Sequence, residues 1–111
     1  MTFEQWAIVV VPFPFTNRAR EIRRPALVLS NPDEFGAPTG HSVLAMVTSA
    51  GHTPWPLDVR ISDLSAAGLS APSVIRMKLF TRDDRLVLKQ VGTLGAVDQE
   101  ATRDSLVRLL G

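Results

Sequence analysis

The chain has 111 residues, a mass of 12.1 kDa and a mean hydropathy of +0.11, which fits a single globular domain over residues 1–111. The sequence has twelve Lys and Arg residues and eleven Asp and Glu residues, which gives a net charge of +1. A polyanionic partner would therefore need a local positive patch. The absence of cysteine excludes disulfides and thiol catalysis, and with no apolar run long enough for a membrane span or signal peptide we expect a cytoplasmic protein.

Short apolar segments separated by turn-forming residues predict a protein made mostly of strands. The first is a β-branched run that two prolines end, because proline cannot donate to a ladder. The segment Phe15–Arg24 carries four arginines and is expected to be a loop, and Asp83 with Asp84 is expected at the solvated tip of a hairpin. The expected strands span Trp6–Val11, Pro25–Ser30, Ser42–Ser49, Leu57–Ile61, Ser73–Phe80 and Arg85–Val91.

One long helix is expected at the end of the chain, over Ala96–Leu110. Its spacing places Thr102, Leu106, Leu109 and Leu110 on one face. A single helical turn is expected in Ser62–Gly68, closed by the glycine. The fold class is therefore mostly β with a C-terminal α-helix: a small, mainly antiparallel barrel or twisted sheet whose open edge or mouth the helix covers.

Few kinds of chemistry are open to this set of residues. Two histidines cannot make a three-histidine metal site, and the sequence has no glycine-rich phosphate loop or nucleophile elbow. What remains is Arg24, held extended by Pro25, the pair Thr48-Ser49 at a strand end, and two cations on a later strand. Together these could hold a phosphodiester. From composition and spacing alone, however, a solvated loop-end charge at Arg24 and an ordinary strand threonine at Thr48 is the favoured interpretation.

Several stretches resemble the PemK/MazF/Kid family of type II toxin–antitoxin toxins, and its PemK-like branch most closely. They follow the family's order over nearly the whole chain, and the succession of PFPFT, RRPALVLS and TS is specific. The matching stretches are IVVVPFPFTN (Ile8–Asn17), RRPALVLS (Arg23–Ser30), VTSAGHTPWPLDV (Val47–Val59), AAGLSAPSVIRMKLFT (Ala66–Thr81) and VGTLG (Val91–Gly95) before the closing helix.

This resemblance implies a small SH3-like barrel of the CcdB/PemK/MazF toxin type, working as a homodimer in the cytoplasm. It implies an endoribonuclease that cuts single-stranded mRNA without a metal or other cofactor, and a cognate antitoxin with an acidic tail. The family's catalytic arginine falls on Arg24 and its catalytic threonine on Thr48, with Ser49 assisting.

The chain departs from the family pattern at three places. Trp6-Ala7 stands where the first strand usually opens with Gly-Asp. The Arg-x-Asp of the Kid-type branch reads Arg76-Met77-Lys78, which removes that carboxylate, and the loop histidine of that branch is missing. The arginine and threonine version of the site therefore fits this sequence better.

The resemblance leads to a mechanism in which the RNA 2′-OH attacks the adjacent phosphorus. Arg24 would stabilise the charge on the transition state, and Thr48 would position the phosphate or the hydroxyl. The general base stays open between Glu21 and His52. Phosphate contacts, base stacking and base-edge contacts are expected from Asn17, Arg18, Arg20, Arg23, His52, Trp55, Arg76 and Lys78.

Other functions remain open for this sequence. A PemK-like protein without catalysis would bind nucleic acid or antitoxin and cut nothing. A CcdB-like gyrase poison would share the barrel, but that group relies on a C-terminal Trp-Gly-Ile, whereas this chain ends in Leu109-Leu110-Gly111. A purely structural barrel would have no affinity for RNA.

Overall fold

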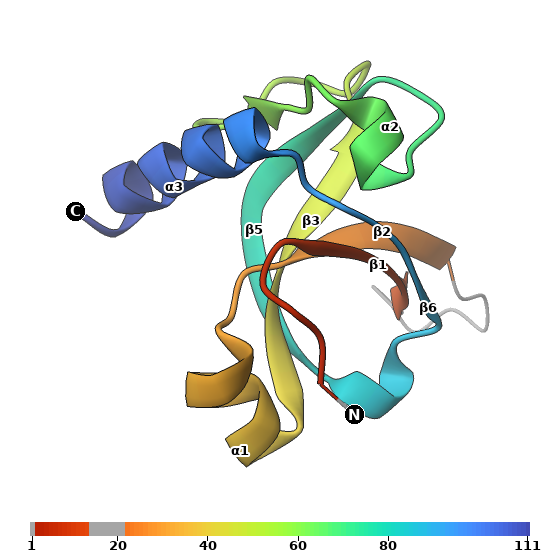
Figure 1. Ribbon diagram of the computed structural model, residues 1–111. Coiled ribbons are helices and arrows are strands. Elements are labelled where there is room, and N and C mark those ends of the chain that lie inside the picture. Colours follow the sequence, from red (N-terminus) through yellow and green to blue (C-terminus); the bar gives the residue numbers. More distant parts are fainter. Residues whose placement is uncertain (1, 14–21) are drawn as a thin grey trace.

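The computed structural model describes residues 2–13 and 22–111. The described residues form one antiparallel sheet of six strands in the order β4-β5-β3-β2-β1-β6. The sheet curls into a half-barrel, and the C-terminal helix lies over the edge formed by β4 and β5 (Figure 1). The strands are β1 (Ala7–Phe13), β2 (Ile22–Val28), β3 (His41–Ser49), β4 (Val59–Arg60), β5 (Ser73–Asp83) and β6 (Lys89–Thr93).

Helical segments fill the connections between the strands. None of those in the described part of the chain is long and apolar enough to cross a membrane. They are η1 (Pro32–Gly36), α1 (Ala37–Thr39), α2 (Leu64–Ala67), η2 (Asp84–Leu86) and α3 (Ala96–Leu110). The predicted fold class, mostly β with a C-terminal helix, is confirmed.

Apolar side chains cover both faces of the central strands, since successive residues of a strand point to opposite sides. Ile8, Leu27 and Ala45 belong to a cluster that packs toward α2 and α3. Their neighbours form a second cluster on the opposite face, which includes Val9, Val11, Ala26, Val28 and Leu44. The three strands β1, β2 and β3 are therefore buried on both sides, as the continuous apolar run in the first strand predicts.

Two glycines allow α2 to sit directly on β6. Gly68 ends α2 with a φ of +73°, and a Cβ there would lie 2.0 Å from the carbonyl oxygen of Val91. A Cβ at Gly92 would lie 2.4 Å from the backbone of Ala67. Any side chain at either position would push the helix off the strand, so the predicted closing role of Gly68 is confirmed and extends to packing.

The structure moves the start of the second strand and so changes the setting of two arginines. β2 begins at Ile22, three residues before the predicted start, and Arg23 and Arg24 pair with Pro12 and Val11 of β1. The prediction that the loop continues to Arg24 is wrong at residues 22–24, because β1 continues through Pro12 and pairs with them. Arg24 is thus a strand residue on a fixed backbone.

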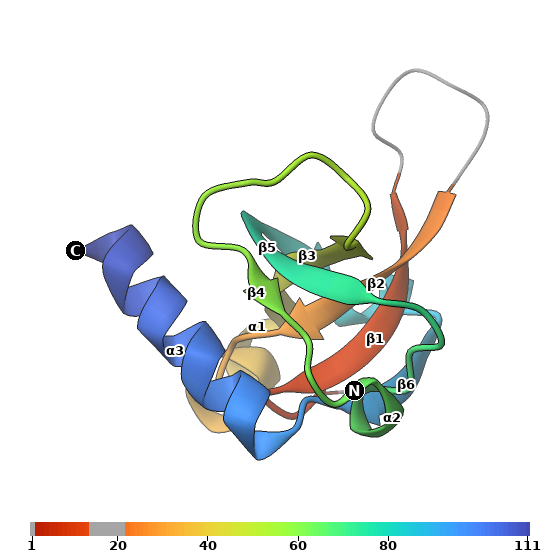
Figure 2. The same cartoon turned by 90° about the horizontal axis from the view of Figure 1, so that it is seen from above.

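The predicted hairpin after the fifth strand is also wrong. β5 runs on to Asp83, the chain turns through η2, and β6 pairs with β1 instead of β5 (Figure 2). Asp84 is not solvated: it is 2% exposed, and the Ser42 hydroxyl donates to its Oδ1 at 2.6 Å. A buried carboxylate next to the start of β3 holds this corner of the sheet.

The bounds predicted for the last helix are confirmed, whereas its buried face differs from the prediction. Thr102 is fully buried and Leu106 packs against the core, but Leu109 and Leu110 are exposed. Asp98 is 2% exposed and accepts hydrogen bonds from the backbone of Ser62 and Asp63 and from the Ser62 hydroxyl, at 2.7–3.0 Å. This carboxylate fastens the start of α3 to the segment after β4.

Asp98→Asn should destabilise the fold in a pH-dependent way. Burial raises the pKa of Asp98, but the hydrogen bonds from Ser62 and Asp63 outweigh it, so the pKa lies below its ordinary value. A lowered folded-state pKa adds stability that is complete above the unfolded pKa of about 3.9 and is lost as the pH falls through the folded value. We expect the substitution to lower the free energy of unfolding by about 2 kcal/mol at pH 7, and by less at pH 3.

Urea denaturation of both proteins at the two pH values measures this difference. Asp104→Asn, on the exposed side of the same helix, is the matched control and should change little. An equal loss for Asp98→Asn at both pH values would contradict the assigned role.

Candidate functional site

A pocket of about 280 Å³ lies where β2, β3 and β5 meet the loop that follows β3. Its walls combine three cations with a hydroxyl, an imidazole and one apolar side chain. Among the described residues, the pocket is lined by Arg24, Met46, Thr48, His52, Arg76 and Lys78. Five of these six are residues that the sequence analysis proposed for catalysis or RNA binding. The sixth, Met46, also packs against the second apolar cluster.

Strand register brings Arg24 and Thr48 to the same pocket. The ladder between β2 and β3 pairs Ala26 with Met46, and the same register continued by two residues puts Arg24 opposite Thr48. Directly opposed residues share a face of an antiparallel sheet. We expected from the sequence that Arg24 and Thr48 would lie close together, and in the structure both line this one pocket.

The pocket opens at this point because the ladder stops there. The Leu29 N–H donates to the Val43 carbonyl of β3, so every second residue back along β2 directs its N–H toward β3. Pro25 is at such a position and has no N–H. Pairing between β2 and β3 accordingly ends at Ala26, and the space beyond is available to the side chains of Arg24 and Thr48.

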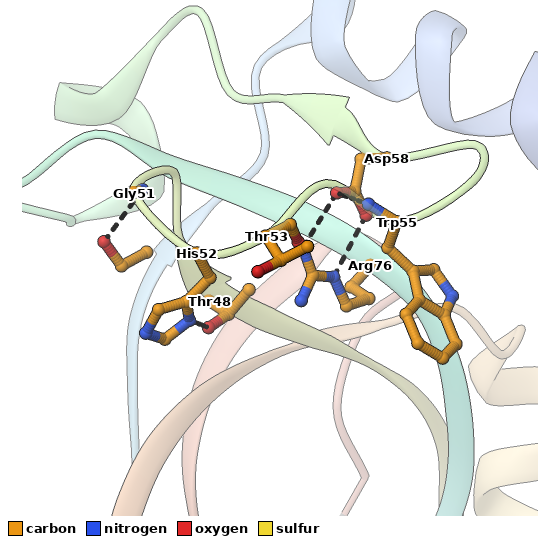
Figure 3. Close-up of polar contacts among 8 residues, drawn as sticks. Thr48, Gly51, His52, Thr53, Trp55, Asp58 and Arg76 are labelled. Atoms are coloured by element: carbon orange, nitrogen blue, oxygen red, sulfur yellow. Dashed lines mark hydrogen bonds and ion pairs between the residues drawn. The ribbon is translucent and has the colours of Figure 1, made fainter.

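The Arg24 guanidinium and the Thr48 hydroxyl differ in whether they have a hydrogen-bond partner. Within the described part of the chain, the buried Nε of Arg24 has no hydrogen-bond partner. Thr48 is 6% exposed, and its Oγ1 lies 2.7 Å from Nδ1 of His52 (Figure 3). A buried guanidinium N–H without an acceptor is costly, so the site is suited to an oxygen-rich anion.

Arg76 is bound to the loop that forms the upper wall. Its Nε donates to Oδ1 of Asp58 at 3.2 Å and its Nη2 donates to Oδ2 at 2.9 Å and to the carbonyl of Thr53 at 2.9 Å (Figure 3). Arg76 is 8% exposed, and its hydrogen bonds to Asp58 raise its pKa. Sequence reasoning missed Asp58, whose spacing from Arg76 matches no motif. The structure therefore gives Arg76 a role in holding residues 50–58, and its expected RNA contact stays a prediction.

Trp55 and Lys78 form an exposed group beside the pocket. The Nζ of Lys78 lies 4.7 Å from the centre of the Trp55 ring, and the Arg76 guanidinium carbon lies 5.8 Å from it. The ladder between β3 and β5 is interrupted here, since Ala45 pairs with Leu79 whereas Met46 pairs with Arg76. Figure 3 shows Trp55 on the side of Arg76 away from Thr48, so the indole flanks the pocket instead of lining it.

Some residues expected at the site lie elsewhere. Ser49 is exposed, and its hydroxyl accepts from the Gly51 N–H in a tight turn, so the described walls of the pocket do not include it. Arg23 alternates to the other side of β2 from Arg24. The candidates Asn17, Arg18, Arg20 and Glu21 lie outside the described residues.

The charge of the pocket defines the ligands it suits. Arg24, Arg76 and Lys78 surround Thr48 and His52, and Asp58, the nearby carboxylate, is neutralised by Arg76. In residues 2–13 and 22–111, no group of three His, Asp or Glu side chains is arranged to hold a metal ion. The arrangement fits a phosphodiester bound by guanidinium and hydroxyl groups.

Comparison with known proteins defines the class to which this fold and site belong. Residues 4–110 match the family model of PemK-like, MazF-like toxins of type II toxin–antitoxin systems. Because the match spans almost the entire chain, the protein belongs to this toxin family, and the resemblance found in the sequence is confirmed. A comparison with curated protein sequences found no match.

Solved structures share the fold over its whole length. The chain is similar to MazF in a MazE–MazF crystal structure from Deinococcus radiodurans, with a TM-score of 0.77 and 26% identity over 100% of this chain and 98% of that chain. It is similar to the Mycobacterium tuberculosis toxin MazF-mt6, with a TM-score of 0.72 and 20% identity over 94% and 95% of the two chains. An endoribonuclease from a mycobacterial species, in complex with its cognate antitoxin, has a TM-score of 0.74 and 14% identity over 99% and 94%. The last two support the fold alone.

Arg76→Met should loosen the wall of the pocket and destabilise the protein. Removing one partner of a buried pair leaves the other charge unpaired, which costs about 3 kcal/mol, and the side chains of Arg76 and Asp58 are 10% and 17% exposed. Amide hydrogen exchange should become faster over residues 50–58. Arg85→Met is the matched control, because Arg85 pairs with Asp83 while 87% exposed, and it should leave stability unchanged. Equal stability of the two variants would contradict a role for the Arg76–Asp58 ion pair in holding residues 50–58.

Proposed function

We propose that this toxin is an endoribonuclease that cleaves single-stranded mRNA in the cytoplasm without a metal cofactor. One observation carries the proposal: Arg24 and Thr48, the two residues that match the family's Arg-Pro and Thr-Ser motifs, line a single cationic pocket. The Nε of Arg24 is buried without a partner among the described residues, and a scissile phosphate would supply the acceptor.

The proposed reaction uses a nucleophile that the RNA itself provides. The 2′-oxygen forms a bond to the adjacent phosphorus, and the bond from phosphorus to the 5′-oxygen breaks. The products are a 2′,3′-cyclic phosphate and a 5′-hydroxyl end. Arg24 donates two N–H groups to the non-bridging oxygens, where negative charge develops, and Thr48 positions the attacking hydroxyl.

Binding of the RNA would rest on the cations and the ring around the pocket. Lys78 is exposed beside Trp55, which is itself 42% exposed. We propose that Lys78 contacts phosphate and that Trp55 stacks on an unpaired base. The acidic tail of a cognate antitoxin would compete with RNA for the same positive charge and would inhibit the toxin by occupying the pocket.

We further propose that the toxin is a homodimer that uses the apolar surface at the end of α3. Val107 and Leu110 are 68% and 78% exposed. An apolar pocket of about 350 Å³, lined in part by Leu29, Leu79 and Leu110, adjoins them. A second copy would bury this surface and extend the groove available to a long RNA.

Arg24→Lys and Thr48→Val should each lower the rate of RNA cleavage by at least about 10²-fold. Lysine keeps the charge of Arg24 but loses the two-pronged donor, and valine keeps the shape of Thr48 without the hydroxyl. Single-turnover cleavage of a long single-stranded RNA, with and without EDTA, measures the effect. Arg60→Lys, at an exposed position on β4 that has no assigned role, is the matched control and should cleave at the wild-type rate.

Two results would contradict this proposal. Wild-type rates in both variants would remove Arg24 and Thr48 from the reaction. Cleavage at a site whose 2′-OH is replaced by hydrogen would exclude internal attack. Tight binding of RNA by the wild-type protein, with no cut products in any buffer, would favour a toxin-family protein that binds and does not cleave.

Val107→Glu combined with Leu110→Glu should convert the dimer to a monomer. Each protomer would bring two carboxylates into the proposed interface, so four like charges would be buried there without a partner. Multi-angle light scattering at micromolar concentration measures the mass. Val97→Glu is the control, since Val97 is 75% exposed at the opposite end of α3. A wild-type protein that is monomeric would refute the proposed interface.

A further inference from the structure

The loop after β3 brings a histidine back onto Thr48. The His52 N–H donates to the Ser49 carbonyl at 3.2 Å, and the Gly51 N–H donates to the Ser49 hydroxyl at 3.2 Å. This turn places Nδ1 of His52 2.7 Å from Oγ1 of Thr48, with both side chains in the cationic pocket (Figure 3).

We propose that His52 takes up the proton of the attacking 2′-hydroxyl by way of the Thr48 hydroxyl. The inference rests on the proposed endoribonuclease function and supplies the base which that function leaves unassigned. His52 does not touch the RNA in this scheme. It acts through Thr48, which does.

The charged groups around the pocket favour His52 over its neighbours as proton acceptor. Arg24 from β2 and Arg76 and Lys78 from β5 are cations, which have no acceptor to offer. Both carboxylate oxygens of Asp58 already accept from Arg76, and Oδ2 also accepts from the backbone N–H of Trp55 at 3.0 Å. Among the described residues that line the pocket, His52 is the one whose side chain carries a nitrogen lone pair that can accept a proton.

The relay balances its protons and electrons. As the 2′-oxygen bonds to phosphorus, its proton passes to Thr48 Oγ1, and the proton of Thr48 passes to Nδ1 of His52. The electron pair of the broken bond leaves with the 5′-oxygen, which takes a proton from water. Arg76 contributes by position, because its bonds to Thr53 and Asp58 hold the loop that carries His52.

His52→Asn separates proton uptake from positioning. The asparagine side chain places an amide close to the site of Nδ1 and keeps a hydrogen bond to Thr48, but it does not accept a proton. We expect the single-turnover cleavage rate at neutral pH to fall by about 10²-fold or more, while the affinity for an RNA with a 2′-deoxy substitution at the cut site stays unchanged. The decline of the wild-type rate toward acid pH should be absent from the variant.

His41→Asn is the matched control, since the other histidine stands at the opposite end of β3 with Nδ1 2.8 Å from the Thr39 carbonyl. It should cleave at the wild-type rate. In a Thr48→Val background, His52→Asn should cost little more, because the relay is already broken.

The outcomes separate this inference from the function on which it rests. If the wild-type protein cleaves RNA and His52→Asn cleaves equally well, the relay is overturned and the endoribonuclease stands. Restoration of the variant by a substrate with sulfur in place of the 5′-oxygen, a leaving group that needs no proton, would make His52 an acid and also overturn the relay. A wild-type protein that does not cleave RNA overturns both.

Discussion

The missing N–H of Pro25 is the constraint on which the site depends. It falls on the side of β2 that faces β3, so the ladder between these central strands ends at Ala26 and Met46. The backbone of β2 nevertheless stays fixed there, because Arg24 and Pro25 pair with Val11 and Val10 of β1. The pocket thus lies where the two central strands stop pairing, and Arg24 lines it from a backbone that β1 keeps fixed.

The ion pair between Arg76 and Asp58 changes what the family resemblance means at this position. The Kid-type branch has Arg-x-Asp there, and this chain has Arg76-Met77-Lys78. The carboxylate partner of the arginine comes instead from residue 58, on the loop, with both nitrogen-to-oxygen distances at or below 3.2 Å. Arg76 is therefore fixed by a carboxylate from outside the motif, and the position of the missing aspartate carries the cation Lys78.

How far the sequence predicts this molecule depends on how local each feature is. The bounds of α3 and the ends of β3 follow from short-range periodicity, and they match the structure closely. The partner of β6 does not, because the turn at η2 sends the chain away from its nearest neighbour. The conformation of Trp6 also depends on distant residues. Its φ of +76° is one that favours glycine, but the residue is buried, with 7% exposed, and the Arg103 guanidinium lies 5.1 Å from its ring. Family motifs located Arg24 and Thr48, whereas contacts across 18 residues, as between Asp58 and Arg76, leave no pattern to read.

The pocket has two kinds of support, and they differ in strength. Arg24 and Thr48 are held by strand pairing with Val11 and Val74. His52 belongs to a loop that no ladder fixes, so its distance from Thr48 depends on the turn at Ser49 and on the grip of Arg76 on the Thr53 carbonyl. Geometry at a reacting centre has to be held to a fraction of an ångström. β5 therefore helps to position His52, although it does not touch it. Its residue Arg76 holds the loop at Thr53 and Asp58, and the loop holds the His52 imidazole next to Thr48.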